Sequence, residues 1–318
     1  MLDPRDLYDL HEVSPHPSQA DPSTTGPVLL HALTGFIDAG QAGALAAAHL
    51  LGSMEHRPLA TFDVDQLLDY RSRRPPMLFV EDHWESYEDP SLVLHELTDA
   101  AGRRFLLLEG AEPDVQWERF IAAVTSLIET FGARLTIGVH GIPMGIPHTR
   151  PTSVTAHATR SDLVTGRDAW VGTVQVPGSI INLLELRLGQ AGRDAMGFAV
   201  HVPHYLAQAD YPDAAAALLE NVAAATELML PTAPLRAAAE AARVDLDQQV
   251  AGSAEVAAVV HALEQQYDTY VEARGGDAPG DEQGLLAGRH GFPTADELGA
   301  ELERFLAEQH KGGEHPDS

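Results

Sequence analysis

The fold is decided between residues 28 and 51, where the sequence reads VLLHAL (28–33), TGFIDAG (34–40) and QAGALAAAHLL (41–51). A short apolar run that enters a glycine-containing loop and then an Ala/Leu-rich segment predicts a buried strand, a tight loop and a helix. Such units build layered α/β folds, because the helix covers one face of the sheet to which the strand belongs.

The same alternation continues outward along the chain. Apolar runs predict further strands at 59–64, 77–80, 92–97, 105–108, 135–139, 154–158, 171–176 and 197–202. The runs at 92–97 and 105–108, separated by AAGR (100–103), predict a hairpin or a tight pair. Apolar residues at helical spacing predict helices at 114–131, 179–190 and 212–230. Strands that alternate with helices of this length predict an α/β fold with a largely parallel sheet.

Composition divides the chain into four parts. Residues 1–26 are polar and predict an irregular N-terminal arm, and residues 27–230 form the α/β core. The sequence PTAP (231–234) blocks continuation of the last core helix and opens an all-helical C-terminal appendage, 231–310, before a polar tail, 311–318. The appendage contains one amphipathic stretch at 254–273 and a second helix after the capping box of Thr294 and Glu297.

Charge and composition exclude several functions. The 318 residues include 47 acidic and 20 basic side chains, a net charge of -27, which disfavours nucleic acid as a partner. No cysteine is present, so a thiolate nucleophile and a cysteine-ligated zinc are excluded, and the one lysine, Lys311, lies in the tail. With no signal pattern and no long apolar run, we expect a cytoplasmic protein with no membrane partner and no cofactor.

The loop between the first strand and helix is the first candidate site. Gly35 and Gly40 let backbone amides approach an anion at a helix N-terminus, and Asp38 is a candidate catalytic base. The alternative is a tight turn in which Asp38 caps the helix. The glycine spacing matches neither a dinucleotide fingerprint nor a phosphate-binding P-loop.

Three arginines and a strand-end carboxylate form the next candidates. Arg71, Arg73 and Arg74 could hold a carboxylate or a phosphate, or could pair internally with acids just upstream, Asp63, Asp65 and Asp69. Glu109 begins the acidic run EGAEPD (109–114) and is a candidate for acid–base chemistry, whereas Glu112 and Asp114 could equally be first-turn helix residues.

Histidines follow two of the later strands. His140 begins HGIP (140–143), His148 and Arg150 lie in PHTRP (147–151), and His201 and His204 lie in HVPHY (201–205). These histidines are candidates for proton transfer, and Arg150 for holding an anionic group. Their spacing fits no zinc signature, so we expect no metal, and histidines at strand ends can also simply satisfy backbone groups.

Five of these stretches together carry a family resemblance. LTGFIDAG (33–40), DYRSRRP (69–75), LEGAEPD (108–114), PHTRP (147–151) and HVPHY (201–205) resemble, in this order, the bacterial branch of the proteasome assembly chaperone 2 family. The resemblance implies a three-layer αβα core of the phosphorylase/hydrolase-like fold with a small helical C-terminal part. Chaperones of this group that dock on proteasome rings tend to end in a hydrophobic–Tyr–any-residue tail, whereas this chain ends in HPDS, so we do not expect docking by that route.

Two functions remain open from the sequence. The resemblance implies a protein-interaction or assembly factor without catalysis, whose partner is a proteasome subunit or another protein. The alternative is a hydrolase- or phosphorylase-like enzyme or binder that uses an Arg/His/Asp-lined crevice for an anionic ligand. On either hypothesis we expect a homo-oligomer, a trimer in the simplest case.

Overall fold

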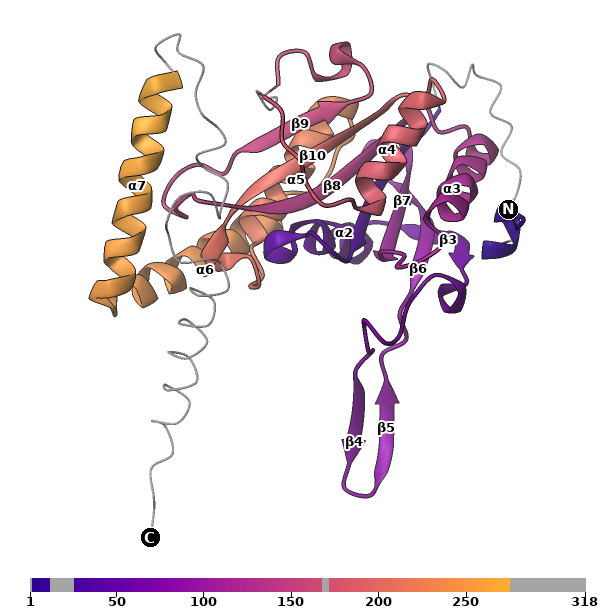
Figure 1. Cartoon of the computed structure of the whole chain (residues 1–318), viewed down its shortest axis with the longest axis horizontal. Helices are drawn as coiled ribbons and strands as arrows, with labels where there is room; N and C mark the ends of the chain where they lie inside the picture. The colour runs from indigo at the N-terminus through magenta and orange to yellow at the C-terminus, as the bar shows by residue number, and fades with distance from the viewer. Residues whose placement is uncertain (1, 12–25, 168–171, 275–318) are drawn as a thin grey trace.

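The computed structural model describes residues 2–11, 26–167 and 172–274, and its centre is one eight-stranded sheet (Figure 1). Its strand order is β1 (Tyr8–Leu10), β3 (His56–Phe62), β6 (Leu92–Thr98), β7 (Arg104–Ala111), β2 (Val28–Thr34), β8 (Leu135–Met144), β10 (Ala195–Pro203) and β9 (Val154–Ala158). The α/β class that the sequence predicts is confirmed.

The sheet is mixed rather than largely parallel. Strands β7, β2, β8 and β10 run parallel in the centre, whereas β6, β3 and β1 on one side and β9 on the other are joined by antiparallel pairings. The parallel centre needs crossover helices and is apolar on both faces, while a tight turn suffices for the β6–β7 hairpin. The prediction of parallel strands therefore holds for the centre of the sheet, and the predicted hairpin of 92–97 and 105–108 is confirmed as the β6–β7 pair.

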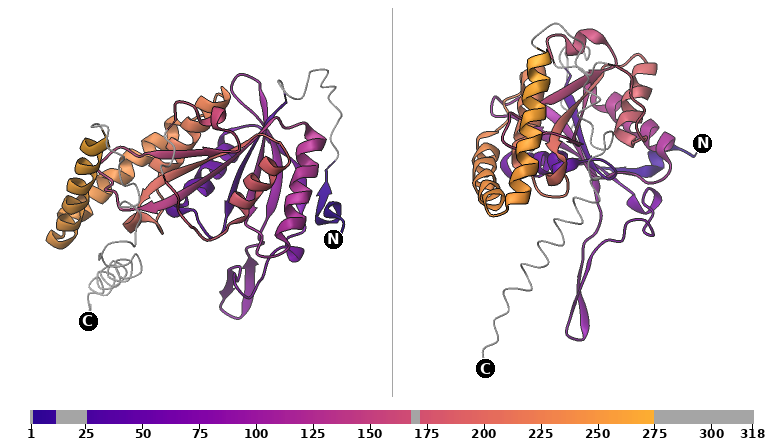
Figure 2. Two further views of the ribbon diagram at one scale, coloured as in Figure 1. Left: turned by 45° about the horizontal axis from the view of Figure 1, so that its top comes forward. Right: turned by 60° about the vertical axis from the view of Figure 1, so that its left-hand side comes forward.

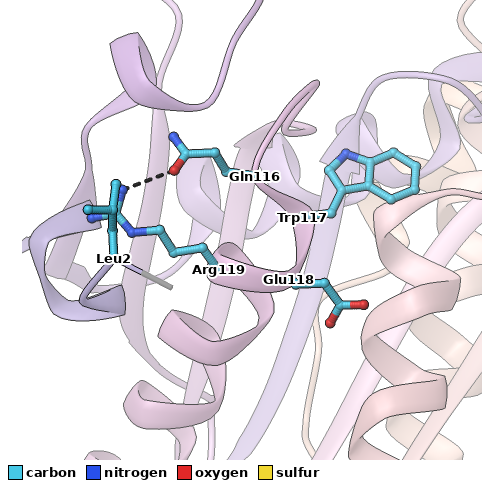
Figure 3. A pocket seen from close by; sticks show the side chains of 5 residues that line it. All are labelled: Leu2, Gln116, Trp117, Glu118 and Arg119. Atoms are coloured by element: carbon cyan, nitrogen blue, oxygen red, sulfur yellow. Dashed lines mark hydrogen bonds between the residues drawn. The ribbon is translucent and has the colours of Figure 1, made fainter.

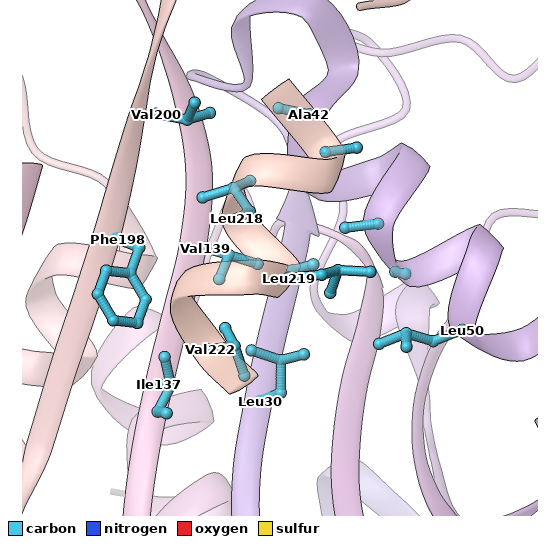
Figure 4. Close-up of a cluster of buried hydrophobic side chains, with 14 of the residues drawn as sticks. Leu30, Ala42, Leu50, Ile137, Val139, Phe198, Val200, Leu218, Leu219 and Val222 are labelled. Carbon is cyan, nitrogen blue, oxygen red and sulfur yellow. The ribbon is translucent and has the colours of Figure 1, made fainter. Parts of the chain in front are cut away.

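Helices cover both faces of the sheet. Helices α2 (Ala42–Ser53) and α5 (Pro212–Thr226) pack on one face, where Leu30 and Val139 meet Leu50 and Leu219 (Figure 4). Helices α3 (Trp117–Phe131) and α4 (Ile180–Gln190) pack on the other face against Leu29, Leu33 and Leu106. Alternate residues of β2 thus face opposite layers, and the core consists of three layers.

Two further helices extend the layer of α2 and α5. Helix α6 (Ala233–Ala251) packs on α5 through the buried Leu235, and α7 (Ala254–Arg274) packs on α6. Tyr267 and Tyr270 of α7 also cover Met144 and Ile146. The helical character of 231–274 is confirmed, and the capping-box helix at Thr294 lies outside the described residues.

Three segments differ from the sequence prediction. The expected irregular arm instead supplies a short 3-10 helix (Pro4–Leu7) and the edge strand β1, because Leu7 buries its side chain in the core. Residues 172–176, expected as part of a strand, pair with no described strand, and their exposed side chains give them no face to bury. The hairpin partner of β4 (Met77–Val80), β5 (His83–Tyr87), was not predicted.

The β4–β5 hairpin projects from the body as a narrow arm, and both views in Figure 2 show it apart from the three layers. The residues of these two strands are exposed, except for the partly buried Val80. None of the helices in the described residues is long and apolar enough to cross a bilayer.

Candidate functional site

The candidate site residues lie beyond the carboxyl ends of the four parallel strands. Asp38 follows β2, Glu112 follows β7, His148 follows β8 and His204 follows β10. Helix N-termini and loops converge at this edge of a parallel sheet, and ligands in α/β proteins usually bind there. The contacts of each side chain decide whether this edge is open to a ligand.

Asp38 is fully engaged with the backbone. Its carboxylate accepts hydrogen bonds from the amides of Gly43 (2.9 Å) and Ala44 (3.0 Å) in the first turn of α2, and from Gly141 of β8 (2.9 Å). Burial raises the pKa of this carboxyl, against the three amides, which favour the charged form. Asp38 therefore caps the first turn of α2 as the alternative predicts, although Gln41 occupies the N-cap position of that helix, and the link to Gly141 additionally fixes α2 against the sheet.

Gly35 lies in the same loop for a steric reason. A Cβ atom at Gly35 would stand 2.1 Å from Oε2 of Glu112, so no larger residue fits there unless Glu112 moves. Gly40 has φ +67, a left-handed conformation that glycine adopts without strain. Both glycines thus have structural reasons that do not involve an anion, and their ligand-binding role stays a prediction.

Glu112, for which the sequence also allowed a place in the first turn of a helix, is a buried hydrogen-bond acceptor at this edge. It is 6% exposed, and its carboxylate accepts from the amides of Phe36 (2.7 Å) and Ile180 (2.9 Å), which joins the β2 loop to the N-terminus of α4. Its hydrogen-bond partners are 76 and 68 residues away in the sequence, so they cannot be predicted from a local sequence pattern.

The arginine cluster divides into one internal and two outward-facing members. Arg73 donates to the carbonyl oxygens of Thr34 (3.1 Å) and Glu112, and forms an ion pair with Asp114 (2.5 Å). The internal-pairing alternative therefore holds for Arg73, but its partner is Asp114 rather than the upstream acids. Among the described residues, the exposed Arg71 and Arg74 form no ion pair.

Glu109 is paired across two strands. Its carboxylate lies 3.1 Å from Nε2 of His95 on β6, and the glutamate side chain is 23% exposed. This hydrogen bond lies within the sheet on the β7–β6 side, and the described contacts of Glu109 reach none of the other candidate residues.

His148 is the centre of a buried hydrogen-bond chain. The hydroxyl of Tyr205 accepts from the His148 amide (2.8 Å) and lies 2.6 Å from Nδ1, while Nε2 lies 3.2 Å from a carboxylate oxygen of Asp247 on α6. The Tyr205 proton therefore points to Nδ1, and Nε2–H donates to Asp247. Burial lowers the pKa of His148 and raises that of Tyr205, so both groups are neutral at pH 7.

Arg150 holds α7 in place. Its guanidinium makes two parallel hydrogen bonds to the carboxylate of Asp268 (2.8 and 2.7 Å) and reaches Glu264 at 3.3 Å. These hydrogen bonds raise the pKa of Arg150, and Thr149 donates to Glu264 beside it (2.6 Å). The described contacts of Arg150 thus bind the β8 loop to the appendage.

The side chains of His201 and His204 contact different residues. The ring of His201 contacts the hydroxyls of Thr155 (2.8 Å) and Ser153 (3.4 Å) at the β9 edge. The ring of His204 stacks edge-on against Tyr205 with centroids 5.5 Å apart, and burial lowers its pKa. Their catalytic roles stay predictions.

Two further histidines are buried inside the sheet, and of these only His140 is among the strand-end histidines that the sequence singles out. His31 on β2 and His140 on β8 are 2% and 5% exposed, and neither Nδ1 atom has a hydrogen-bond partner within the described residues. Burial and the neighbouring His157 lower the pKa of His31 to about 4 and that of His140 to about 3. The described residues contain no group of three or more histidines and carboxylates that could hold a metal ion.

Two cavities open on the surface of the described part of the chain. One, of about 370 Å³, is lined by Leu2 and residues 116–119, and Figure 3 shows the guanidinium of Arg119 beside Leu2 and bonded to Gln116. The other, of about 510 Å³, lies between the end of α2, the β6–β7 turn and the segment after α5. None of the candidate site residues lines either of these two cavities.

The chain is similar to proteins of one family along most of its length. A family model described as the PAC2 family matches residues 32–250. A Mycobacterium tuberculosis protein of unknown function, Rv2714, is 51% identical, with a TM-score of 0.79 over 84% of this chain and 92% of its own. A Corynebacterium glutamicum protein of unknown function is 40% identical, with a TM-score of 0.78 over 84% and 98%.

A more distant relative has a description that bears on function. The M. tuberculosis protein Rv2125, described as a proteasome-assembly chaperone homologue, is 26% identical, with a TM-score of 0.67 over 73% of this chain and 99% of its own. Among curated proteins, no match is found.

Proposed function

Because the chain belongs to the PAC2 family, we propose that it is a protein-binding assembly factor rather than an enzyme, with a proteasome subunit as the first partner to test. One observation carries the proposal: Asp38, Arg73, Glu112, His148 and Arg150, which would serve an anionic substrate, are each engaged by groups of the chain itself. A catalytic site needs such groups turned toward a substrate.

The two C-terminal helices supply the surface for a partner. Exposed acids on this surface that form no ion pair within the described residues are Glu240, Asp245, Glu255 and Glu272. The segment 231–318 carries 17 acidic and 6 basic residues, a net charge of -11. Such a surface complements a basic partner, and the resulting attraction speeds association and weakens as salt is added.

The resemblance to this family extends the proposal to three finer properties. We propose a phosphorylase/hydrolase-like arrangement of the three layers, a location in the cytoplasm, and a homo-oligomeric assembly. The similarity to Rv2125 supports the choice of proteasome assembly as the process to test first.

The test is native mass spectrometry of the full chain purified gently from its own cells. We expect a stoichiometric complex with a second protein, which the triple variant Glu240→Arg/Asp245→Arg/Glu255→Arg should lose. The matched control Asp9→Arg/Glu55→Arg reverses exposed acids on β1 and after α2, and should retain the partner.

Two outcomes would contradict the proposal. A small molecule bound to each subunit, with no protein partner, would support a ligand-binding site instead. Full retention of the partner by the triple variant would show that the acidic helices do not form the binding surface.

A further inference from the structure

Exposed apolar side chains gather on the loops that follow β2 and β7 and on the segment before α4. Phe36 is 60% exposed, Val115 is 44% exposed and Val176 is 58% exposed. These loops meet at Glu112, whose carboxylate accepts from the amides of Phe36 and Ile180. The three side chains therefore belong to one region, which we call the apolar edge patch. Contiguous apolar patches on a surface mark interaction sites.

A hollow continues the apolar edge patch at the start of α3. Leu2 and Trp117 line the cavity of about 370 Å³, and Figure 3 shows them on either side of Gln116. A Cβ atom at Gly178 would stand 3.8 Å from the indole ring of Trp117, so the segment that carries Val176 runs past this side chain. An interface gains most of its binding energy from a few side chains that fill such hollows.

Two cations stand beside the apolar edge patch. Arg73 donates to the carbonyl oxygen of Glu112, which brings the turn 71–74 next to the patch. Arg71 and Arg74 in this turn are exposed and form no ion pair within the described residues. In a chain with a net charge of -27, unpaired guanidinium groups next to an apolar surface favour an occupant that carries carboxylates.

The chain itself contains a segment of this chemistry outside the described residues. In 294–310 the apolar residues recur at helical spacing after the capping box, at Leu298, Leu302, Phe305 and Leu306. The segment also has five acids and one arginine, and two of the acids, Glu297 and Glu301, are four residues apart and thus on one side of a helix. An acidic amphipathic segment matches an apolar surface flanked by arginines.

We propose that residues 294–310 dock on the apolar edge patch of the same chain. The apolar side that the spacing predicts covers the patch, and its largest side chain fills the hollow. Glu297 and Glu301 lie against Arg71 and Arg74. A partner that binds this edge of the molecule must then displace the segment first.

The length of the chain allows this contact. Tyr270, one turn before the end of α7, covers the end of β8, and β7 lies two strand positions away, which is about 10 Å. Nineteen residues, six of them glycine, separate Arg274 from Thr294. A glycine-rich chain of this length has a root-mean-square end-to-end distance of about 25 Å. Attachment at this range gives an effective concentration in the millimolar range, so even a weak intrinsic affinity is enough for docking.

Intramolecular crosslinking of the full chain tests the docking. The chain contains no cysteine, so Ser72→Cys beside the arginines and Ala295→Cys in the segment can be joined by a short bis-maleimide without background reaction. The matched control pairs Ala295→Cys with Ala100→Cys, an exposed position in the β6–β7 turn at the opposite edge of the sheet. We expect at least fivefold more crosslinked single chain from the first pair than from the control pair.

Substitutions in both surfaces test the apolar contact. In the crosslinking chain, Leu298→Ser/Leu302→Ser should lower the yield at least threefold, and Phe36→Ser/Val176→Ser should do the same from the other side. The control Val244→Ser removes an exposed apolar side chain of α6 and should leave the yield unchanged. Because neither patch residue belongs to a core cluster, thermal unfolding of the patch variant should match that of the parent.

A charge exchange tests the ionic contact. Arg71→Glu/Arg74→Glu should lower the crosslink yield at least threefold, since like charges then face one another. Adding Glu297→Arg/Glu301→Arg to this variant should restore the yield. Restoration by exchange distinguishes a direct contact from a general effect of net charge.

Three outcomes would overturn the inference. The first is an equal yield from the test pair and the control pair, and the second is an undiminished yield in the patch variant. The third is a product that joins two chains instead of closing one, because the segment then binds another copy. Each of these results is independent of whether the acidic surface of α6 and α7 binds another protein.

Discussion

Acidification from about pH 7.5 to about pH 5 should destabilise the folded chain by about 4 kcal/mol through two buried histidines. His31 and His140 have their pKa lowered from 6.5 to about 4 and about 3, because burial disfavours the charged ring and no carboxylate compensates. In the unfolded chain both rings take up protons below about pH 6.5, so the unfolded state binds more protons and gains stability as the pH falls.

The magnitude follows from the gap between the two states. A pH of 5 is about 1.5 units below the pKa of an unfolded histidine, which is therefore mostly charged, whereas the buried rings stay neutral. This difference lowers the free energy of unfolding by about 2 kcal/mol per histidine. The stability is fully present above the unfolded pKa and is lost progressively until the pH reaches the folded values.

Urea unfolding at a series of pH values measures this loss. The variants His31→Leu and His140→Leu should each reduce the drop between pH 7.5 and 5 by about 2 kcal/mol, and the double variant should reduce it by about 4 kcal/mol, with a remainder from His148 and His204, whose pKa burial also lowers. The control His261→Leu removes a side chain that is 68% exposed on α7, and should leave the drop unchanged. A wild-type drop below about 1 kcal/mol, or an equal drop in the double variant, would refute the reasoning.

Three further changes test the contacts at the strand ends. Asp38→Ala removes the acceptor of three amides and should lower the free energy of unfolding by about 3 kcal/mol in urea, with Asp38→Asn about half as costly. Glu112→Gln places an amide donor against a backbone N–H and should cost about 2–4 kcal/mol, whereas the partly exposed Glu109→Gln should cost under about 1 kcal/mol. Arg150→Ala should speed amide exchange in α7 about tenfold while leaving the central strands unchanged, and equal exchange in both would contradict its role.

The core strands were predictable because a strand that is buried on both faces consists mainly of apolar residues, which the local sequence shows. The run at 28–33 is apolar on both faces, as a central parallel strand must be, and Ser179 at the start of α4 carries its own cap signal. β5 (His83–Tyr87) was missed since all five of its residues are exposed, so no apolar alternation marks it. The segment 172–176 has apolar residues but no described strand beside it, which sequence alone cannot reveal.

The candidate site was predictable in position but not in contacts. Asp38 could be assigned as a helix cap from its place before α2, because both partners in the helix lie within six residues. The partners of Glu112 and His148 lie 68 and 99 residues away, and only the folded topology brings them together. The local sequence shows which residue stands at a strand end. Its hydrogen-bond partners come from distant parts of the chain, and the local sequence does not reveal them.

The amide donors that bind ligands at this edge in other α/β proteins are here hydrogen-bonded to carboxylates of the chain itself. Helix N-termini and free loop amides concentrate hydrogen-bond donors at the carboxyl ends of parallel strands, and anions bind there for that reason. In this chain the Asp38 and Glu112 carboxylates already occupy four such amides, and Asp38 also accepts from the Gly141 amide of β8. An anionic substrate at these positions would have to displace a buried carboxylate and would be repelled by its negative charge. The Asp38 and Glu112 carboxylates therefore act as internal anions that allow these amide donors to be buried, which supports testing the outer surfaces of the molecule first.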